Sequence, residues 1–158
     1  MGKRGREIVG VDVKELIKDL NKAYADEWIA YFDYTWAADV ASGINSPAVA
    51  GELDRIAAEE LEHSEEIAAR ILELGGEPIR DFEKLQPTAN CKKVIFPKDP
   101  SDLKGILKGA IEAERCAIDV YNNLLKKIKI GKDPVTVQVI RHIMTEEIAH
   151  EEAFESLL

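Results

Sequence analysis

Four long stretches of the sequence carry apolar side chains at intervals of three and four residues. This is the period of an α-helix that buries one face and exposes the other. The stretches cover residues 12–42, 47–74, 101–128 and 134–158. No stretch shows the alternating, β-branched pattern that is typical of strands. The sequence therefore predicts an all-α fold with four long helices.

The segment between the second and third predicted helices, residues 76–100, is long for a connection in a helical protein. It contains four of the six prolines, so a long helix is not expected there, although a helical turn fits near residues 80–85. A connection of this length lets the second and third helices run parallel in a four-helix bundle. At the shorter break before the second helix, we expect Ser46 to be the N-cap and Pro47 the first helical residue.

The composition favours a soluble protein. With 158 residues, 46% of them hydrophobic, the chain is expected to form one domain over residues 1–158, with an N-terminal tail at residues 1–11. The formal net charge of −9 disfavours DNA as a partner, and "GKRGR" at residues 2–6 is the only basic tail. No run approaches the roughly 18 apolar residues that span a membrane, and no signal peptide is evident. A cytoplasmic location follows as an expectation.

Glutamates interrupt the apolar face of each predicted helix. A Glu does so in the first and third helices, and a Glu-x-x-His motif does so in the second and fourth. Residues three apart lie about 60° apart around a helix, so both side chains of the motif can contact one ligand. The six residues are Glu27, Glu60, His63, Glu114, Glu147 and His150.

The spacing of these residues repeats between the two halves of the chain. In each half 33 residues separate the two glutamates, and a tyrosine, Tyr34 or Tyr121, follows the first glutamate by seven residues. A single Glu-x-x-His motif is more often part of a solvated helix face. Six matched positions on four faces instead favour two related helical hairpins whose polar side chains meet inside the bundle.

Such a buried cluster predicts a metal centre, because an unpaired buried carboxylate is strongly unfavourable. Two divalent cations would neutralise four glutamates, and oxygen and nitrogen ligands without thiolate suit iron or manganese, although zinc also binds them. Glu59 and Glu146 are alternative ligands, since a step of four also faces one side of a helix, but we expect them to be more exposed. His142 lies outside the pattern and is expected to be structural or exposed.

The chain resembles the ferritin-like superfamily over residues 12–158. The segments "EELEHSEEIAARILELGGEP" and "IEAERCAIDVYNNL" look like the second and third helices of bacterioferritin. The resemblance implies a ferritin-like bundle that binds two iron ions per subunit through the six residues named above, with Glu60 and Glu147 as bridges and Tyr34 and Tyr121 beside them. Leu61 stands where bacterioferritin has its haem-binding Met, so haem is not expected. The chain also lacks the length for a fifth helix, which argues against a 24-subunit cage.

The two cysteines narrow the resemblance to the Dps-like group called thioferritin. Cys91 and Cys116 match a cysteine pair of that group, which implies a redox pair and a homo-oligomer in the form of a hollow dodecamer. From the residues alone, Cys116 lies roughly 200° around the helix from Glu114 and should not be a metal ligand. Whether the two thiols are free or joined stays open at this stage.

These inferences lead to one main functional hypothesis and two alternatives. The main hypothesis is a ferroxidase that oxidises Fe(II), with hydrogen peroxide as the favoured oxidant, and stores Fe(III) in a cage, which protects against oxidative stress. The first alternative is a rubrerythrin-like peroxidase without iron storage. The second is a DNA-protecting cage that has no catalytic role.

Overall fold

The structure is a computed structural model that describes residues 2–128 and 131–158. It is helical, and no strand occurs among those residues. The prediction of an all-α bundle with a long connection between the second and third long helices is confirmed. The elements are α1 (Lys3–Glu7), α2 (Val13–Val40), α3 (Ser46–Leu74), the 3-10 turn η1 (Phe82–Lys84), α4 (Leu85–Thr88), α5 (Leu103–Ile128) and α6 (Pro134–Ser156).

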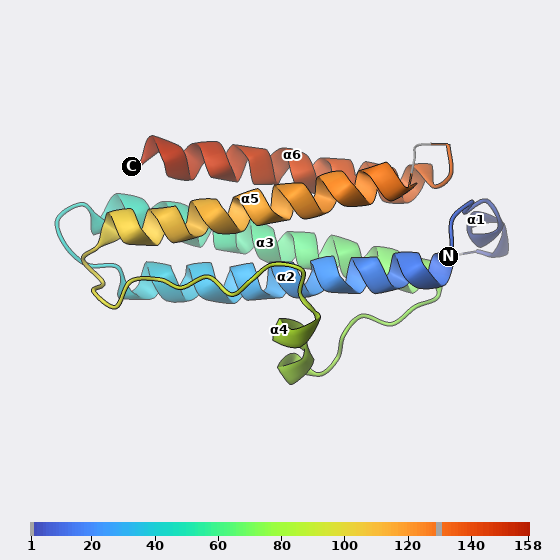
Figure 1. The fold of residues 1–158 in the computed structure, drawn as a ribbon, viewed down its shortest axis with the longest axis horizontal. Helices are drawn as coiled ribbons and strands as arrows, with labels where there is room; N and C mark the ends of the chain where they lie inside the picture. The colour runs from blue at the N-terminus through green and yellow to red at the C-terminus, as the bar shows by residue number, and fades with distance from the viewer. Residues whose placement is uncertain (1, 129–130) are drawn as a thin grey trace.

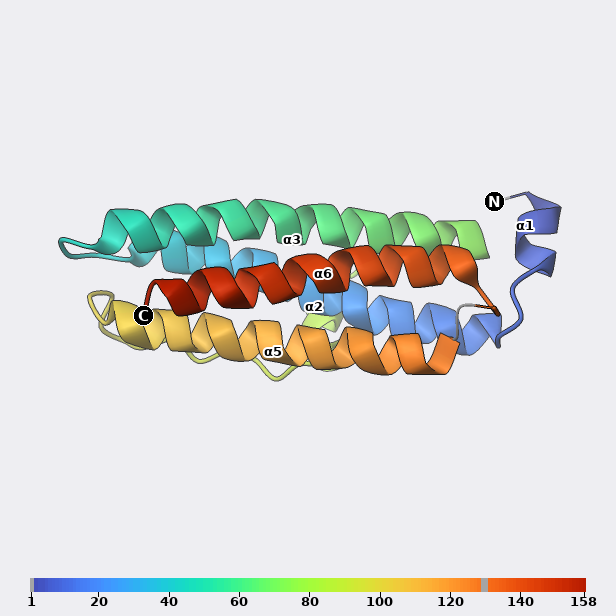
Figure 2. The ribbon, with the colours of Figure 1, turned by 90° about the horizontal axis from the view of Figure 1, so that it is seen from above.

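The four long helices pack as two hairpins laid side by side. Helices α2 and α3 form one hairpin, and α5 and α6 form the other (Figures 1 and 2). Figure 1 also shows that α3 and α5 run in the same direction, and that the crossover returns along the outside of the bundle, with α4 beside α2. The predicted helical turn near residues 80–85 corresponds to η1 and the start of α4.

The helix ends follow local chemistry with two departures from the predicted boundaries. Asp12 and Asp133 cap α2 and α6 by accepting hydrogen bonds from backbone N–H groups of the first turn. Helix α3 begins at Ser46 itself, so the predicted N-cap is wrong by one residue: Asn45 takes that place, and the Ser46 hydroxyl donates to the Gly43 carbonyl at 2.9 Å. The predicted tail also contains α1, which sequence reasoning missed.

Two apolar clusters fill the bundle on either side of a polar layer. One is built around residues such as Leu20 and Ile67, the other around residues such as Leu53 and Phe154. On each long helix, the inward Glu or the Glu-x-x-His motif lies between the segments that supply these two clusters. The apolar packing therefore fixes the helices above and below the polar layer and positions its side chains.

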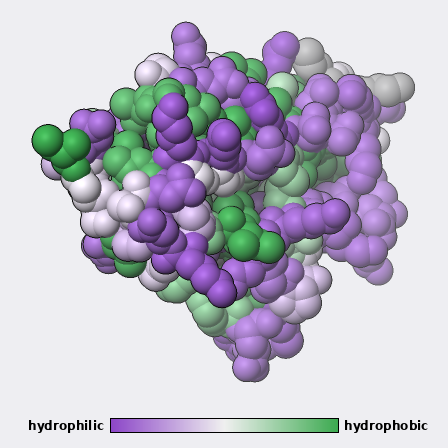
Figure 3. All heavy atoms as spheres, turned by 60° about the vertical axis from the view of Figure 1, so that its left-hand side comes forward, coloured by the Kyte–Doolittle hydropathy of each residue, from purple (hydrophilic) through white to green (hydrophobic). Residues whose placement is uncertain are grey.

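The outer surface is mainly polar, with separate apolar patches (Figure 3). Several large apolar side chains on α2, on η1 and along the crossover are exposed, including Phe32, Trp36, Phe82 and Ile95. Among the helices of residues 2–128 and 131–158, none combines the length and apolar character that crossing a membrane requires.

Candidate metal centre

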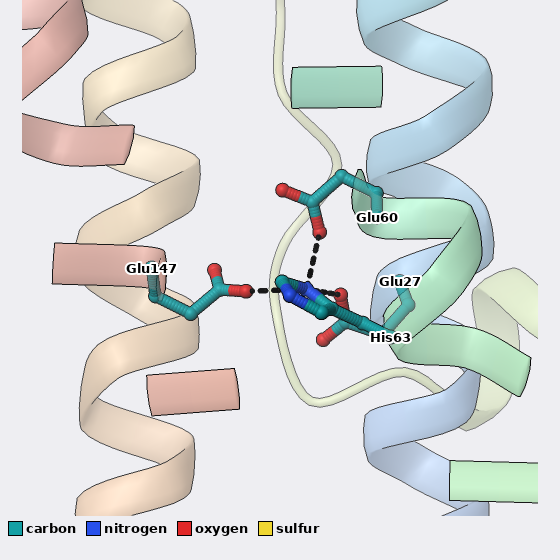
Figure 4. Close-up of side chains that lie close together, drawn as sticks. All are labelled: Glu27, Glu60, His63 and Glu147. Carbon is teal, nitrogen blue, oxygen red and sulfur yellow. Dashed lines mark ion pairs between the residues drawn. The ribbon is translucent and has the colours of Figure 1, made fainter. Parts of the chain in front are cut away.

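The six predicted side chains come together at the middle of the bundle. Each is at most 2% exposed. Helices α2 and α5 supply one Glu each, whereas α3 and α6 supply a Glu and a His each. Figure 4 shows Glu27, Glu60 and Glu147 directed at the ring of His63. We call these six residues, Glu27, Glu60, His63, Glu114, Glu147 and His150, the Glu/His cluster.

In one half of the cluster, three carboxylates surround the Nδ1 atom of His63. This atom lies 3.0 Å from Glu147 Oε1, 3.4 Å from Glu27 Oε2 and 3.6 Å from Glu60 Oε2. One ligand atom from each of these four residues falls within 4.8 Å of the others. That spacing allows one cation to contact all four.

The other half is built in the same way around His150. Its Nδ1 atom lies 3.2 Å from Glu60 Oε1 and 3.5 Å from Glu114 Oε2. A second group of four, Glu60, Glu114, Glu147 and His150, again has its ligand atoms within 4.8 Å of one another. Glu60 and Glu147 belong to both groups, so the arrangement suits two cations that share two carboxylates.

The histidines are oriented by carboxylates outside the cluster. His63 Nε2 is 2.7 Å from Glu146 on α6, and His150 Nε2 is 2.7 Å from Glu59 on α3. When the imidazole is neutral, as a metal ligand must be, an Nε2–H that donates to a carboxylate leaves Nδ1 with its lone pair directed at the cluster. With side chains 34% and 40% exposed, Glu59 and Glu146 are more exposed than the cluster, as expected.

This orienting role is one that sequence reasoning missed. From the sequence, Glu59 and Glu146 were identified only as alternative metal ligands. A signal was nevertheless present, because both motifs read Glu-Glu-x-x-His. Each Glu that precedes the motif reaches the histidine of the other hairpin, a pairing that depends on how α3 packs on α6.

The two predicted tyrosines each hold a terminal glutamate of the cluster. The hydroxyl of Tyr121 donates to Glu27, and that of Tyr34 donates to Glu114 Oε1 at 2.5 Å. Both rings are fully buried, and burial together with the adjacent glutamates raises the tyrosine pKa values well above their usual range. They therefore remain hydrogen-bond donors at neutral pH and fix which carboxylate oxygen faces the centre.

The cluster attracts positive charge strongly. Burial and the neighbouring carboxylates raise the pKa values of Glu60 and Glu147 well above the usual range. Burial alone would lower the pKa of His63, but the adjacent Glu147, Glu27 and Glu60 raise it overall. At Glu27 burial would raise the carboxyl pKa, but His63, Glu60 and Tyr121 together lower it overall. Either protons or metal cations can supply the charge that these groups require.

The hydrogen-bonding state of the cluster fits a metal centre. Within the described residues, one buried nitrogen or oxygen atom of every member has no hydrogen-bond partner, although several lie at ion-pair distance from one another. Buried polar atoms are rarely left in this way, because each carries a desolvation cost. The atoms are Glu27 Oε2, Glu60 Oε1, His63 Nδ1, Glu114 Oε2, Glu147 Oε1 and His150 Nδ1. Oxygen and imidazole donors suit iron or manganese, and also zinc.

The two cysteines form a disulfide beside this centre. Cys91 on the crossover is bonded to Cys116 on α5, with Cα atoms 5.9 Å apart. Cys91 also lines the cavity that contains the cluster glutamates. Its backbone N–H donates to Asp26, whose pKa is raised by burial to about 6. The disulfide thus ties the crossover to the bundle next to the cluster, and Cys116 is not a cluster member.

Comparisons with known proteins place this geometry in a family. Residues 17–158 match the Ferritin family of ferritin-like domains. The chain belongs to the ferritin-like family. A curated relative, the "DNA protection during starvation protein" of Pyrococcus furiosus, is 38% identical over 152 residues, which are 96% of this chain and 81% of that one. Bacterioferritin of Desulfovibrio desulfuricans is 31% identical over 143 residues, 90% of this chain and 74% of that one.

Solved structures of the family agree with this placement. A dodecameric thioferritin, the bacterioferritin-related protein of Bacteroides fragilis, superposes with a TM-score of 0.92 at 35% identity and covers 99% of this chain and 92% of that one. Dps from Staphylococcus aureus superposes with a TM-score of 0.82, covering 90% of this chain and 94% of that one, at 17% identity, which supports the fold alone. The expected Dps-like, thioferritin-type resemblance is confirmed.

Proposed function

We propose that this chain is a ferroxidase subunit that binds two Fe(II) ions at the Glu/His cluster, oxidises them with hydrogen peroxide and stores Fe(III) inside a hollow homo-oligomer. One observation carries the proposal. Six buried oxygen and nitrogen atoms, one on each side chain of the cluster, lack hydrogen-bond partners among the described residues. The six side chains form two groups of potential metal ligands that share two carboxylates. Family membership and the bacterioferritin relative support iron as the metal.

Each member of the cluster has a distinct role in this proposal. Two terminal pairs would each hold one iron, and two shared carboxylates would contact both. Glu146 and Glu59 would keep the imidazole lone pairs directed inward, and the tyrosines would hold the terminal glutamates. The terminal pairs are Glu27 with His63 and Glu114 with His150, and the shared carboxylates are Glu60 and Glu147. No haem is proposed, because Leu61 follows Glu60.

The proposed reaction balances with two irons and one peroxide. Each Fe(II) gives up one electron, the O–O bond of peroxide breaks, and two protons complete two molecules of water. Because both electrons come from one centre, no hydroxyl radical need be released. Because their pKa values are raised, the carboxyl groups of Glu60 and Glu147 release protons when cations bind. These protons become available where peroxide is reduced. In a cytoplasmic setting this reaction would protect against oxidative stress.

Rapid mixing of Fe(II) with peroxide tests the proposal. The unaltered protein is expected to oxidise two Fe(II) per chain in a fast phase, followed by absorbance from Fe(III) mineral. The Glu60→Ala, Glu147→Ala double variant should lose the fast phase. A matched control, Glu62→Ala with Glu152→Ala, removes two exposed glutamates from the same helices and should keep it. Equal rates in the unaltered protein and the Glu60, Glu147 variant would reject the proposal.

The proposed assembly is a dodecamer, by likeness to the thioferritin that is described as dodecameric. The exposed aromatic side chains of α2 and η1, Phe32, Trp36 and Phe82, support burial of this surface against another copy. Light scattering after size exclusion checks the assembly, with a particle of about twelve chains expected from that likeness.

A second candidate is a peroxidase without storage, which the disulfide beside the cavity favours. Two thiols at Cys91 and Cys116 could reduce one peroxide to two water molecules by forming the disulfide, which an external dithiol would then reopen. A Cys91→Ser, Cys116→Ser variant that loses dithiol-dependent peroxide reduction in the absence of iron, but keeps Fe(II) oxidation by peroxide, would support this redox role. A small oligomer that retains no iron would favour this candidate over storage.

Direct DNA binding is not part of the proposal, although one relative carries a DNA-protection name. The formal net charge of −9 opposes contact with phosphates. Removal of Fe(II) and peroxide would protect DNA without touching it. Gel retardation of DNA that weakens with salt would instead show that the basic residues of α1 bind DNA directly.

A further inference from the structure

A groove lies between the crossover and helix α5. Its volume of about 690 Å³ is within the usual range for a small-molecule site. The α5 residues that line it include four at steps of four, three and four, which therefore share one face of the helix: Gly105, Gly109, Glu112 and Cys116. Among the described residues that line the groove, none is an aromatic residue assigned above to contact between copies.

The groove is basic, although the chain as a whole is acidic. Lys92 and Lys93 of the crossover and Lys108 of α5 line it, and Glu112 is the carboxylate among its lining residues. Glu112 is itself paired with Arg115 at 3.2 Å. The side chains of Lys92 and Lys108 are exposed, and neither forms an ion pair within the described part of the chain. A negatively charged molecule in this groove would therefore meet positive charge that the chain does not neutralise.

The disulfide joins this groove to the cavity of the Glu/His cluster. Cys116 lines the groove, whereas Cys91 lines the cavity, and both residues are half-buried. The two spaces need no open passage between them, because the covalent bond itself links the two sides. A reagent in the groove would reach Cys116 first, and attack on that sulfur would expel Cys91 beside the cluster glutamates.

We propose that the groove binds a small anionic thiol, which reduces the disulfide by attacking Cys116. A small thiol fits better than a protein, because Cys116 is half-buried and the groove has the size of a small-molecule site. The lysines select negatively charged groups on that thiol. The proposal deepens the second candidate function, and it rests on that candidate only for the peroxide that closes the disulfide again.

The proposed reduction takes place in two steps. The thiolate of one small molecule bonds to Cys116 Sγ while the bond to Cys91 breaks, and Cys91 leaves as a thiolate that takes up a proton. A second small thiolate then attacks the sulfur of the first, so that Cys116 leaves as a thiolate and is protonated. Two small thiols are oxidised to one disulfide, and the protein gains two electrons and two protons.

Reduction of the assembled protein by mercaptosuccinate, which carries two carboxylates, and by the neutral 2-mercaptoethanol tests the proposal without iron or peroxide. Acid quenching, alkylation and mass spectrometry count the disulfide that remains. The Lys92→Gln, Lys108→Gln variant should lower the ratio of the mercaptosuccinate rate to the 2-mercaptoethanol rate about tenfold, because it weakens the attraction of an anion. The ratio isolates anion binding, since any stabilisation of the leaving thiolate by lysine accelerates both thiols.

The matched control is the Lys98→Gln, Lys126→Gln variant. It also removes one lysine from the crossover and one from α5, but neither residue lines the groove, so the ratio of rates should stay unchanged. Because both variants have the same net charge, a difference between them reports the position of the lysines. Peptide mapping of the quenched intermediate should find the small thiol bonded to Cys116.

Three outcomes would overturn the proposal. The first is an equal ratio of rates in the two double variants, and the second is an intermediate in which the small thiol is bonded to Cys91. The third is reduction by a thioredoxin but by neither small thiol, which would make the partner a protein. Failure of the second candidate function gives a different result. A disulfide that prefers mercaptosuccinate through Lys92 and Lys108, in a protein whose thiols do not reduce peroxide, would retain the groove and reject the peroxidase.

Discussion

Two buried polar clusters in this bundle differ in how their buried charges are balanced. Near the start of α6, Arg70, Asp133 and Thr136 are all at most 2% exposed. The guanidinium of Arg70 donates to both carboxylate oxygens of Asp133, at 2.9 and 3.0 Å, and to Thr136 Oγ1 at 2.7 Å. We call these three residues the Arg70 clamp. The Glu/His cluster is equally buried but acidic, and each of its members keeps an atom without a hydrogen-bond partner within the described residues.

The difference separates a structural element from a candidate functional site. In the Arg70 clamp each charge meets an opposite charge of the same chain, so the clamp holds the start of α6 against α3 without any ligand. In the Glu/His cluster four carboxylates face two imidazoles, so the charge can be balanced only by protons or metal cations. Burial alone therefore does not identify a site, whereas burial with unbalanced charge does.

Breaking the Arg70 clamp should have the largest effect on stability. Asp133→Ala removes the buried carboxylate that accepts two hydrogen bonds from Arg70, leaves the half-exposed Glu73 as a remaining carboxylate partner, and removes the cap of α6, so the free energy of unfolding should fall by about 3 kcal/mol. Denaturant titration at fixed protein concentration measures this. The Arg70→Met, Asp133→Ala double variant should recover part of the loss, because no lone charge remains. A loss below about 1 kcal/mol in Asp133→Ala would contradict the structural role of the clamp.

The corresponding change in the Glu/His cluster should affect metal binding rather than the fold. Glu60→Gln replaces a carboxyl of raised pKa with a neutral group of the same shape, so the metal-free protein should stay within about 1 kcal/mol of the original. The original protein should gain about 2.7 kcal/mol at a Co(II) concentration 100 times Kd, and the variant should lose most of that gain. Glu62→Gln, an exposed change on the same helix, is the control. Full metal stabilisation of Glu60→Gln would disprove the shared-ligand role.

The pH dependence of stability should also distinguish the two clusters. Burial and neighbouring carboxylates raise the pKa values of Glu60 and Glu147 in the folded protein, and the carboxylates around His63 and His150 raise theirs. The folded metal-free protein therefore holds protons that the unfolded chain has released. Its stability should decrease from pH 6 to pH 8, by about 1.4 kcal/mol per pH unit for each such proton.

Metal should reverse this trend, because cations replace the retained protons and bind more tightly as pH rises. Thermal unfolding at pH 6, 7 and 8, with chelator and with Co(II), measures both behaviours. The Glu60→Gln, Glu147→Gln variant should have a shallower slope in chelator, while variants of the Arg70 clamp should keep the original slope. Metal-free stability that increases over this range would show that the cluster does not retain protons.

The contrast also explains how much of the molecule could be predicted from its sequence. Helix positions and the inward glutamates follow from periodicity within one segment, and the repeated spacing indicated that Glu27 and Glu114 are equivalent. The structure brings the six residues together, although their metal-binding role stays a prediction. The fold could be predicted because the spacing of apolar residues within each helix identifies the face that it buries.

Contacts between helices could not be predicted in the same way. The pairing of Glu59 with His150 joins residues 91 positions apart, and that of Arg70 with Asp133 joins residues 63 positions apart. Both depend on the register of α3 against α6, which periodicity leaves free. The path of the crossover decides the partners of Asp26 in the same manner, and no local pattern in residues 76–100 specifies that path.

The outer carboxylates permit a smaller test within the Glu/His cluster itself. Glu59 is held by Arg55, whose guanidinium donates to it at 2.6 and 2.7 Å, and it in turn orients His150. Glu59→Gln should weaken Co(II) binding about tenfold, the lower end of the usual effect for such orienting groups. Glu52→Gln is a matched control, because Glu52 also binds Arg55 but contacts no histidine. Chelator competition measures both affinities, and equal values would show that Glu59 does not support the imidazole.

The partner of Glu59 in the other half, Glu146, should have the smallest effect. It orients His63 at 2.7 Å, but its nearest basic neighbour besides that ring is the exposed His142 at 3.8 Å, and its side chain is 40% exposed. A carboxylate held less firmly and screened by water contributes less, so Glu146→Gln should weaken Co(II) binding only about threefold. Glu66→Gln is the control, since Glu66 approaches His142 but not His63. If Glu146→Gln weakens binding as much as Glu59→Gln, the Arg55 anchor does not matter and the two halves are equivalent in energy as well as in geometry.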